Sequence, residues 1–348
     1  AYVDALIREI ELTAALPHLP RRFDTVFFGG GTPSLLGGEA LSSLLRRLRA
    51  CFDILPEAEI SLECNPGTAD ESMLRACRAA GVNRLSVGMQ SCSDRLLKDL
   101  GRIHDHRMFL DCVRLARAAG FENINADVMH GLPGQTRRDS LETLRAAAEL
   151  ELEHISAYAL ILEPHTPLHA RAARGETFLP DADEVADMQD EGFAYLASRG
   201  YERYEISNFA RPGFYCRHNW NYWQNGEYLG FGVAAHSAAR LSEWTRWANT
   251  ESLSEYLRLT ARGKRPLAEI IRLFPADEMF ESVMLGLRLV QGVERAAFQA
   301  RFGARLEEAY PSAVEALRAR GWLLETETHI ALTPQGLDMQ NAALQFFL

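Results

Sequence analysis

Three consecutive glycines and a threonine are the residues of this sequence best suited to bind a ligand through the backbone. Gly29, Gly30, Gly31 and Thr32 follow an apolar run of β-branched and aromatic residues that ends at Phe28. Because glycine has no Cβ, the backbone of such a run can approach a ligand closely where a strand ends. A glycine turn after a strand is as often structural as functional, so the surrounding residues must decide between the two interpretations.

Four polar residues stand at or near the ends of later strand-like runs: Glu63, Gln90, Arg102 and Asp127. Any one of them could cap a helix or lie in solvent. Their occurrence at successive strand ends favours one shared site instead. Carboxylates would bind an amine or hydroxyl groups, and the Arg102 guanidinium would pair with a carboxylate. An amino acid joined to a ribose carries all of these groups.

The elements that must position these residues alternate between strand and helix through the first half of the chain. Strand-like runs cover residues 24–28, 59–63, 84–87, 123–128 and 154–160. Helix-like stretches lie between them, at residues 39–51, 70–80, 92–100, 108–119 and 138–150. This alternation predicts an α/β fold, with a parallel sheet and helices outside it. Five consecutive units favour a partial TIM-like barrel with its ligand site at the carboxyl ends of the strands.

The second half of the chain has a different pattern. Residues 165–215 are more polar, with one helix predicted over 182–199, and residues 216–250 are dense in aromatic side chains. Helices are predicted over 277–289, 293–301 and 305–320, two short strands flank residues 325–328, and Thr333-Pro334 opens a last helix. This order predicts a mainly helical C-terminal domain that ends in a winged-helix-like module. The module lacks a basic recognition surface, which favours packing or a protein partner over DNA binding.

Composition narrows the class of protein. The 348 residues are 47% hydrophobic and carry a formal net charge of −10, which is typical of a soluble globular protein and argues against a general binder of nucleic acid or anionic membranes. No apolar run approaches the ~20 residues of a transmembrane helix, and no secretion signal is visible. The six cysteines show no CxxC or CxxxCxxC spacing. We therefore expect free thiols in a reducing cytoplasm, and no metal cluster built from these six alone.

Several motifs together resemble the radical S-adenosylmethionine core of the oxygen-independent coproporphyrinogen III oxidase family. They are FFGGGTP at 27–33, Glu63-x-Asn65-Pro66, Gly88-x-Gln90-Ser91, Gly101-Arg102 and Asp127-x-x-x-Gly131-Leu132-Pro133-Gly134-Gln135-Thr136. The resemblance covers nearly the whole chain and implies an incomplete (β/α)6 barrel followed by a helical C-terminal domain.

The resemblance also implies which residues bind the cofactor. By motif match, Gly30, Gly31 and Thr32 would contact the methionyl part of S-adenosylmethionine. The resemblance assigns the rest of the site to Glu63, Gln90, Arg102, Asp127 and a backbone contact near Ala159. No catalytic residue is assigned.

The iron-binding motif of that family is absent from this sequence. The family carries CxxxCxxC before the segment that opens this chain, and three thiolates there bind a [4Fe–4S] cluster with one iron open to S-adenosylmethionine. The chain opens inside an amphipathic helix, with Val3, Leu6, Ile7 and Ile10 on one face and no capping residue before it. We expect that the cluster segment lies upstream. The expected domains are a truncated core barrel over 1–165, an aromatic-rich linker region over 166–265 and a C-terminal domain over 266–348.

His218 decides between the branches of the family. It lies in Cys216-Arg217-His218-Asn219-Trp220-Asn221-Tyr222-Trp223. An imidazole can bind haem iron axially, and aromatic faces can shelter the macrocycle. From the residues alone, a buried histidine in an aromatic core is the favoured interpretation. The HNxxYW pattern, however, resembles the haem-chaperone branch, which implies haem binding by His218, Tyr222 and Trp223, with His218 on the iron; His236 is a second candidate.

The resemblance therefore implies a haem chaperone that passes haem to an apo-haemoprotein acceptor. The alternative is an enzyme that oxidatively decarboxylates the propionates of coproporphyrinogen III; a third reading is another radical S-adenosylmethionine enzyme. The oxidase would need a basic pocket for several carboxylates, and the second half of the chain shows no compact basic cluster. Whether the chain is an enzyme stays open at this point, as do a homodimer and a transient contact with a membrane protein.

Overall fold

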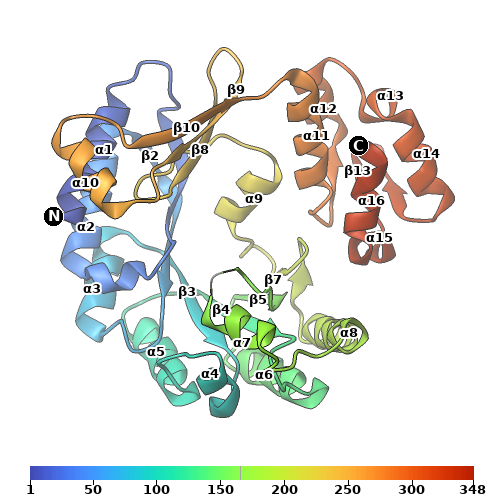
Figure 1. Ribbon diagram of the computed structural model, residues 1–348, viewed down its shortest axis with the longest axis horizontal. Coiled ribbons are helices and arrows are strands. Elements are labelled where there is room, and N and C mark those ends of the chain that lie inside the picture. The colour runs from blue at the N-terminus through green and yellow to red at the C-terminus, as the bar shows by residue number, and fades with distance from the viewer. Residues whose placement is uncertain (165) are drawn as a thin grey trace. The chain divides into compact units, whose positions relative to one another are not determined.

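The computed structural model describes residues 1–164 and 166–348 (Figure 1). Internal contacts divide the chain into two compact units. The first, here called the sheet unit, comprises Thr25–Ser42 and Glu59–Tyr215. The second, the aromatic unit, comprises Ala1–Asp24, Ser43–Ala58 and Cys216–Leu348.

A seven-stranded sheet in the order β1-β2-β3-β4-β5-β7-β6 curls into an open half-barrel (Figure 1). Strands β2 to β5 are parallel, and β7 and β6 follow in antiparallel pairing. The partial barrel predicted from the sequence is confirmed. The strands are β1 (Arg22–Phe28), β2 (Asp53–Cys64), β3 (Arg84–Gln90), β4 (Asn123–His130), β5 (His154–Ala159), β6 (Glu202–Arg203) and β7 (Asn208–Ala210).

Helices connect the parallel strands, as the alternation predicts. Local capping explains where several begin: the Asp70, Asp105 and Thr136 side chains each accept a backbone N–H of the first turn. Helix α5 packs against β3, and α6 packs against β4 (Figure 1). The helical elements of this unit are η1 (Pro33–Leu36), α3 (Glu71–Ala80), α4 (Asp94–Asp99), α5 (His106–Ala118), α6 (Arg137–Glu149), α7 (Pro167–Ala173) and α8 (Ala182–Ser198). Helix α2 (Gly38–Cys51) begins in this unit and continues into the aromatic unit.

The two faces of the parallel strands differ sharply in polarity, because side chains alternate along each strand. One face is apolar and buried: Leu85, Val87, Met89, Ile124, Ala126, Val128, Ile155 and Ala157. The alternate positions are polar: Glu63, Arg84, Ser86, Asn125, Asp127, His154 and Ser156. Neighbouring strands pair in register, so the polar positions share one face. The apolar face supplies the core, and the polar face is left for hydrogen bonding and binding.

The aromatic unit contains a three-stranded antiparallel sheet that the sequence analysis does not predict. Its strands run in the order β10-β9-β8. The β8 sequence, HSAAR, has none of the β-branched or aromatic residues that mark strands, so pairing with β9 decides its conformation. The elements are α1 (Tyr2–Ala14), α9 (Arg217–Trp223), β8 (His236–Arg240), β9 (Trp244–Asn249), α10 (Leu253–Ala261) and β10 (Leu267–Arg272).

The C-terminal module has the helices and the small antiparallel sheet, β11-β13-β12, expected of a winged-helix-like module. A hydrophobic cluster that includes Leu317, Ile330 and Phe347 forms its core. The single helix predicted over 305–320 is wrong: it divides into two helices, because Pro311 lacks an N–H and starts a new helix. The elements are α11 (Pro275–Gly286), β11 (Val293–Glu294), α12 (Arg295–Phe302), α13 (Leu306–Ala309), α14 (Pro311–Ala319), β12 (Leu323–Glu325), β13 (His329–Leu332), α15 (Pro334–Asp338), α16 (Gln340–Leu344) and η2 (Gln345–Phe347).

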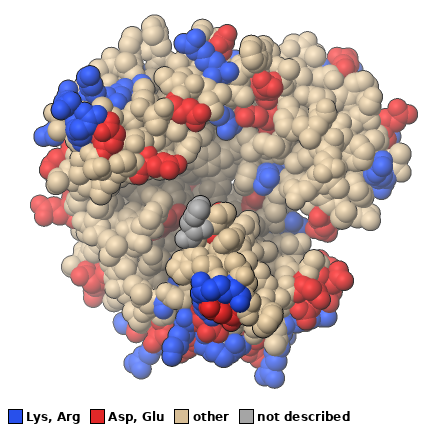
Figure 2. All heavy atoms as spheres, in the orientation of Figure 1, with Lys and Arg blue, Asp and Glu red and all other residues tan. Residues whose placement is uncertain are grey.

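Two further properties of the structure bear on function. Among the described residues, no helix is long and apolar enough to cross a bilayer. On the face shown in Figure 2, Lys and Arg are mixed with Asp and Glu.

Candidate functional site

The polar face of the sheet opens into a pocket at the carboxyl ends of its strands. This is the edge at which barrel folds bind ligands. Six of the eight residues predicted for S-adenosylmethionine line it: Gly31, Thr32, Glu63, Gln90, Arg102 and Asp127. The lining also contains residues that the sequence analysis does not assign: Pro33, Cys64, Asn65, Ser86, Gly88 and Tyr158.

The glycine loop forms an open cradle beside Glu63. Gly30 has φ +88°, a conformation that favours glycine, and its N–H hydrogen-bonds to the Glu63 carboxylate. A Cβ on Gly31 would meet no atom within 4 Å, so this position faces open space. Thr32 accepts a hydrogen bond from Asn65 Nδ2 at 3.0 Å, which ties the loop to the end of β2. The cradle leaves room for a ligand against the backbone.

Glu63 and Asp127 place two carboxyl groups in the pocket. Burial, and next the negative charge of Asp127, raise the pKa of Glu63 to about 7. Burial also raises the pKa of Asp127, against the hydrogen bonds that it receives. Ser86 Oγ donates to Asp127 Oδ2 at 3.0 Å, and Asn125 Nδ2 donates to Oδ1 at 2.9 Å. A cationic or hydroxyl-bearing ligand would relieve the repulsion between the two carboxyl groups.

Gln90 is strained and incompletely satisfied. It has φ +54°, where a side chain costs energy, and the β3–β4 register shifts between Gly88 and Gln90. Its Oε1 is buried and has no hydrogen-bond partner within the described residues. An orphaned acceptor at a strained position in a pocket indicates a group that a ligand donor would satisfy.

Arg102 and Tyr158 complete the rim. The Arg102 side chain is exposed and forms no ion pair with any described residue, so a ligand carboxylate can reach it. Burial, and then the charge of Asp127, raise the pKa of Tyr158. Its position two residues after Ser156 on β5 would have indicated this face, because strand side chains alternate. The predicted Ala159 lies next to Tyr158 at the end of β5 and outside the pocket lining.

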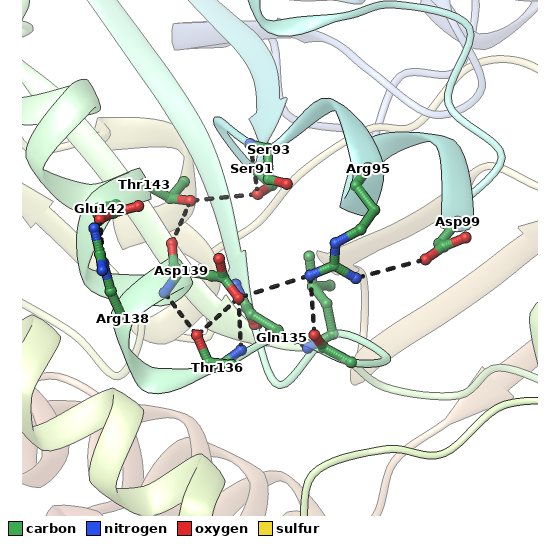
Figure 3. Close-up of polar contacts among 12 residues, drawn as sticks. Ser91, Ser93, Arg95, Asp99, Gln135, Thr136, Arg138, Asp139, Glu142 and Thr143 are labelled. Carbon is green, nitrogen blue, oxygen red and sulfur yellow. Dashed lines mark hydrogen bonds and ion pairs between the residues drawn. The ribbon is translucent and has the colours of Figure 1, made fainter.

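Figure 3 shows how the loops after β3 and β4 are tied together. Ser91, directly after Gln90, has its Oγ 3.3 Å from Thr143 Oγ1 on α6. Arg95 on α4 donates to the Gly134 carbonyl at 3.1 Å and lies 3.8 Å from Asp139. These contacts fix the ends of the two strands that carry Gln90 and Asp127.

His218 lies in the aromatic unit, on the seven-residue helix α9, and no residue of this helix is fully buried. Its Nε2 is 3.0 Å from the Tyr222 hydroxyl, one helical turn along. Burial raises the pKa of Tyr222 to about 12. The ring of Trp223 lies under Arg288 at 5.3 Å, and His236 is exposed at the start of β8. The helix therefore brings the three predicted haem residues into one short segment.

The sequence matches the Radical SAM superfamily over residues 5–147 and the HemN C-terminal domain over residues 273–339. It is 36% identical to Heme chaperone HemW of Escherichia coli over 347 residues, covering 100% of this chain and 89% of that protein. The chain belongs to the HemW family of radical SAM proteins. Other HemW relatives include those of Bacillus subtilis (34%, 100% of this chain and 91% of the relative) and Mycobacterium tuberculosis (37%, 99% and 85%).

A solved structure agrees with the HemW assignment at the level of the fold. Coproporphyrinogen III oxidase (HemN) from Escherichia coli, described as a radical SAM enzyme, matches with a TM-score of 0.83 and 26% identity, over 99% of this chain and 82% of that one. Membership of the radical SAM superfamily implies S-adenosylmethionine and a [4Fe–4S] cluster as cofactors. The pocket suits the first of these: it offers a backbone cradle, an orphaned acceptor and charges of both signs.

The described residues do not suit the second cofactor, the [4Fe–4S] cluster. They contain no group of three His, Cys, Asp or Glu side chains that could hold a metal ion, and each of the six cysteines is free. We therefore derive no step through the cluster.

Proposed function

We propose that this chain is a haem chaperone that binds haem and transfers it to an apo-haemoprotein acceptor, and that its pocket binds S-adenosylmethionine. The observation that carries the proposal is the similarity to curated HemW chaperones along the whole chain, including α9. The three regions 1–165, 166–265 and 266–348 would serve S-adenosylmethionine binding, haem binding and partner contact, respectively.

In the pocket, Glu63 and Asp127 would accept hydrogen bonds from the amine and the ribose hydroxyls. Arg102 would pair with the carboxylate of the methionyl part, and Gln90 Oε1 would accept a remaining donor. Gly30, Gly31, Thr32 and the backbone near Ala159 would contact the ligand chain.

On α9, the His218 imidazole would ligate haem iron, and the rings of Tyr222 and Trp223 would cover the macrocycle. The acceptor would be an apo-haemoprotein. A cytoplasmic location, a homodimer and a transient contact with a membrane protein belong to the same proposal. The formal net charge of −10 supports a protein partner rather than nucleic acid.

Haem titration tests the haem site. Wild-type protein, His218→Ala and the matched control His236→Ala are each titrated with haem and followed by absorption spectroscopy. We expect His218→Ala to lower the affinity and alter the Soret band, and His236→Ala to leave both unchanged. Identical spectra and affinities for all three proteins would remove His218 as the ligand.

A second function, oxidative decarboxylation of coproporphyrinogen III, is favoured by the fold match to HemN over nearly the full chain. It is tested by adding the CxxxCxxC segment, reconstituting the cluster anaerobically and supplying the porphyrinogen. Release of CO2 with consumption of S-adenosylmethionine would establish the enzyme. Haem transfer without decarboxylation supports the chaperone.

A further inference from the structure

A chain of buried hydrogen bonds runs from the pocket into the sheet, beyond the residues that would touch a ligand. Asp127 accepts from Asn125 Nδ2 at 2.9 Å. On the next strand, His154 Nδ1 lies 2.6 Å from Asn125 Oδ1, and His154 Nε2 lies 2.8 Å from the Tyr204 hydroxyl. Asn125 and His154 are register partners on β4 and β5. The chain thus links the pocket to the segment between β6 and β7.

The partners determine where each proton lies. Asn125 turns its Nδ2 toward Asp127 and toward Ser86 Oγ, at 2.7 Å, so its Oδ1 must be the acceptor that faces His154. His154 therefore carries its proton on Nδ1, and Nε2 accepts from the Tyr204 hydroxyl. Complete burial holds the pKa of His154 well below its ordinary value, which keeps the ring neutral. Every link in the chain then donates in the direction of Asp127.

His154, together with Ser156 Oγ, which also donates to Asn125 Oδ1 at 3.2 Å, fixes the orientation of the Asn125 amide. If this amide turned over, its oxygen would face the Asp127 carboxylate and its NH2 group would face the N–H of His154. The first contact would be repulsive, and the second would be relieved only if His154 moved its proton from Nδ1 to Nε2. His154 and Asn125 are 0% and 1% exposed, so water could not repair the repulsion. The imidazole, as the shorter of these two contacts to Asn125 Oδ1, thereby favours the orientation in which Asp127 receives a donor on its inner side, and this leaves other lone pairs of Asp127 for the pocket.

We propose that His154 is a positioning residue for ligand binding: acting through Asn125, it holds Asp127 oriented and ionised at the pocket, without touching the ligand. The inference rests on the proposed S-adenosylmethionine site. Glu63 on β2, Arg84 on β3 and Tyr158 on β5 are the other titratable or charged groups that act on Asp127. They are left unchanged in the test.

A double-mutant cycle tests the proposal by isothermal titration with S-adenosylmethionine. His154→Leu removes the donor and should weaken binding by up to about tenfold, the upper end for one lost hydrogen bond to a neutral amide. His154→Asn keeps an amide donor near the position of Nδ1 and should retain most of the affinity. His154→Leu combined with Asp127→Asn should bind no more weakly than Asp127→Asn alone. Wild-type affinity in His154→Leu, or losses that multiply in the double variant, would overturn the proposal.

A readout without ligand separates this inference from the proposed function. The Asp127 carboxyl is titrated by 13C NMR in wild type and in His154→Leu. We expect the pKa of Asp127 to be higher in the variant, because loss of the oriented Asn125 donor destabilises the carboxylate. An unchanged titration refutes the role of His154. Tyr204→Phe, which keeps the ring, should shift the titration in the same direction by less and replaces His154→Leu if that variant does not fold. Failure of wild type to bind S-adenosylmethionine would refute the proposed ligand, and the titration would still decide on His154.

Discussion

The pocket of the sheet unit and helix α9 of the aromatic unit are built in opposite ways. The pocket collects side chains from residues 31 to 158, delivered by the ends of several strands and held by buried hydrogen bonds. Helix α9 presents seven consecutive residues, none of them fully buried, with His218 and Tyr222 paired one turn apart. A site assembled by tertiary structure is preorganised, so single changes should have large effects. A site on one short helix should respond more weakly.

A side chain added at Gly31, in the glycine cradle, should have the largest effect on affinity for S-adenosylmethionine. Gly31→Val adds a side chain where the structure shows open space, and Gly31 does not require a positive φ. The variant should keep its melting temperature and lose affinity for S-adenosylmethionine by at least about 100-fold, because the added methyl groups occupy the ligand's place. Calorimetric titration measures the loss. The affinity of Gly31→Ala for S-adenosylmethionine should lie between those of wild type and Gly31→Val. Haem binding should not change in either variant. Unaltered affinity in Gly31→Val would show that the ligand does not use the cradle.

Neutralising one pocket carboxyl should have the next largest effect on affinity for S-adenosylmethionine. Glu63→Gln keeps the size of the side chain and removes its charge, so binding of S-adenosylmethionine should weaken by about 10-fold or more at pH 8, the cost of one charge-assisted hydrogen bond. The matched control is Glu71→Gln, an exposed residue paired with Arg75 on α3. Equal affinities for the two variants would contradict the assignment of Glu63.

The raised pKa of Glu63 predicts a pH dependence. With a pKa of about 7, its ionised fraction grows from about 3% at pH 5.5 to about 50% at pH 7. Affinity for the cationic amine should rise over this range in wild type and stay flat in Glu63→Gln. Because the folded pKa exceeds the unfolded value, folding binds a proton, and the contribution of Glu63 to stability falls as pH rises from about 4.5 to 7. Thermal melts of wild type and Glu63→Gln across that pH range check the direction of this change in stability.

The smallest change in ligand affinity should come from a substitution on helix α9. When Nε2 of His218 ligates iron, it must give up its hydrogen bond to the Tyr222 hydroxyl. Tyr222→Phe keeps the ring and removes this competitor, so haem affinity should rise about threefold, the worth of a typical partly exposed hydrogen bond. Absorbance titration with haem measures it, and Tyr228→Phe is the matched control. Weaker haem binding in Tyr222→Phe would show that the hydroxyl acts on the haem itself.

The strands β1 to β5 and the helices between them were predictable because their signals are local, whereas α7, β6 and β7 were not predicted. Apolar runs separated by capped helices give the alternation, and glycine at position 81 ends α3 with φ +109°. The β8–β10 sheet was not predictable, since β8 carries no strand-forming residues and depends on β9. The break at Pro311 was readable from the sequence, because proline at the first position of a helix is a known start signal.

The pocket residues also divide into those that local sequence signals predict and those that only strand pairing places. Glu63, Gln90, Arg102 and Asp127 follow recognisable strands, so their convergence at one edge follows from parallel topology. Tyr158 and Ser86 join them because of strand register, which the sequence does not state. The strained φ of Gln90 arises from the register shift beside Gly88, an interaction between β3 and β4.

By itself, the sequence determined the alternation of strand and helix from β1 to β5, the glycine cradle, the strand-end residues and the HNxxYW segment, because each depends on neighbours within a few positions. Only the tertiary structure decided that one face of the sheet is polar from β2 to β5 and that His154 faces Asn125 beneath Asp127. These contacts join residues 29 positions apart through strand register. Their energies come from burial, which exists only once the strands have paired.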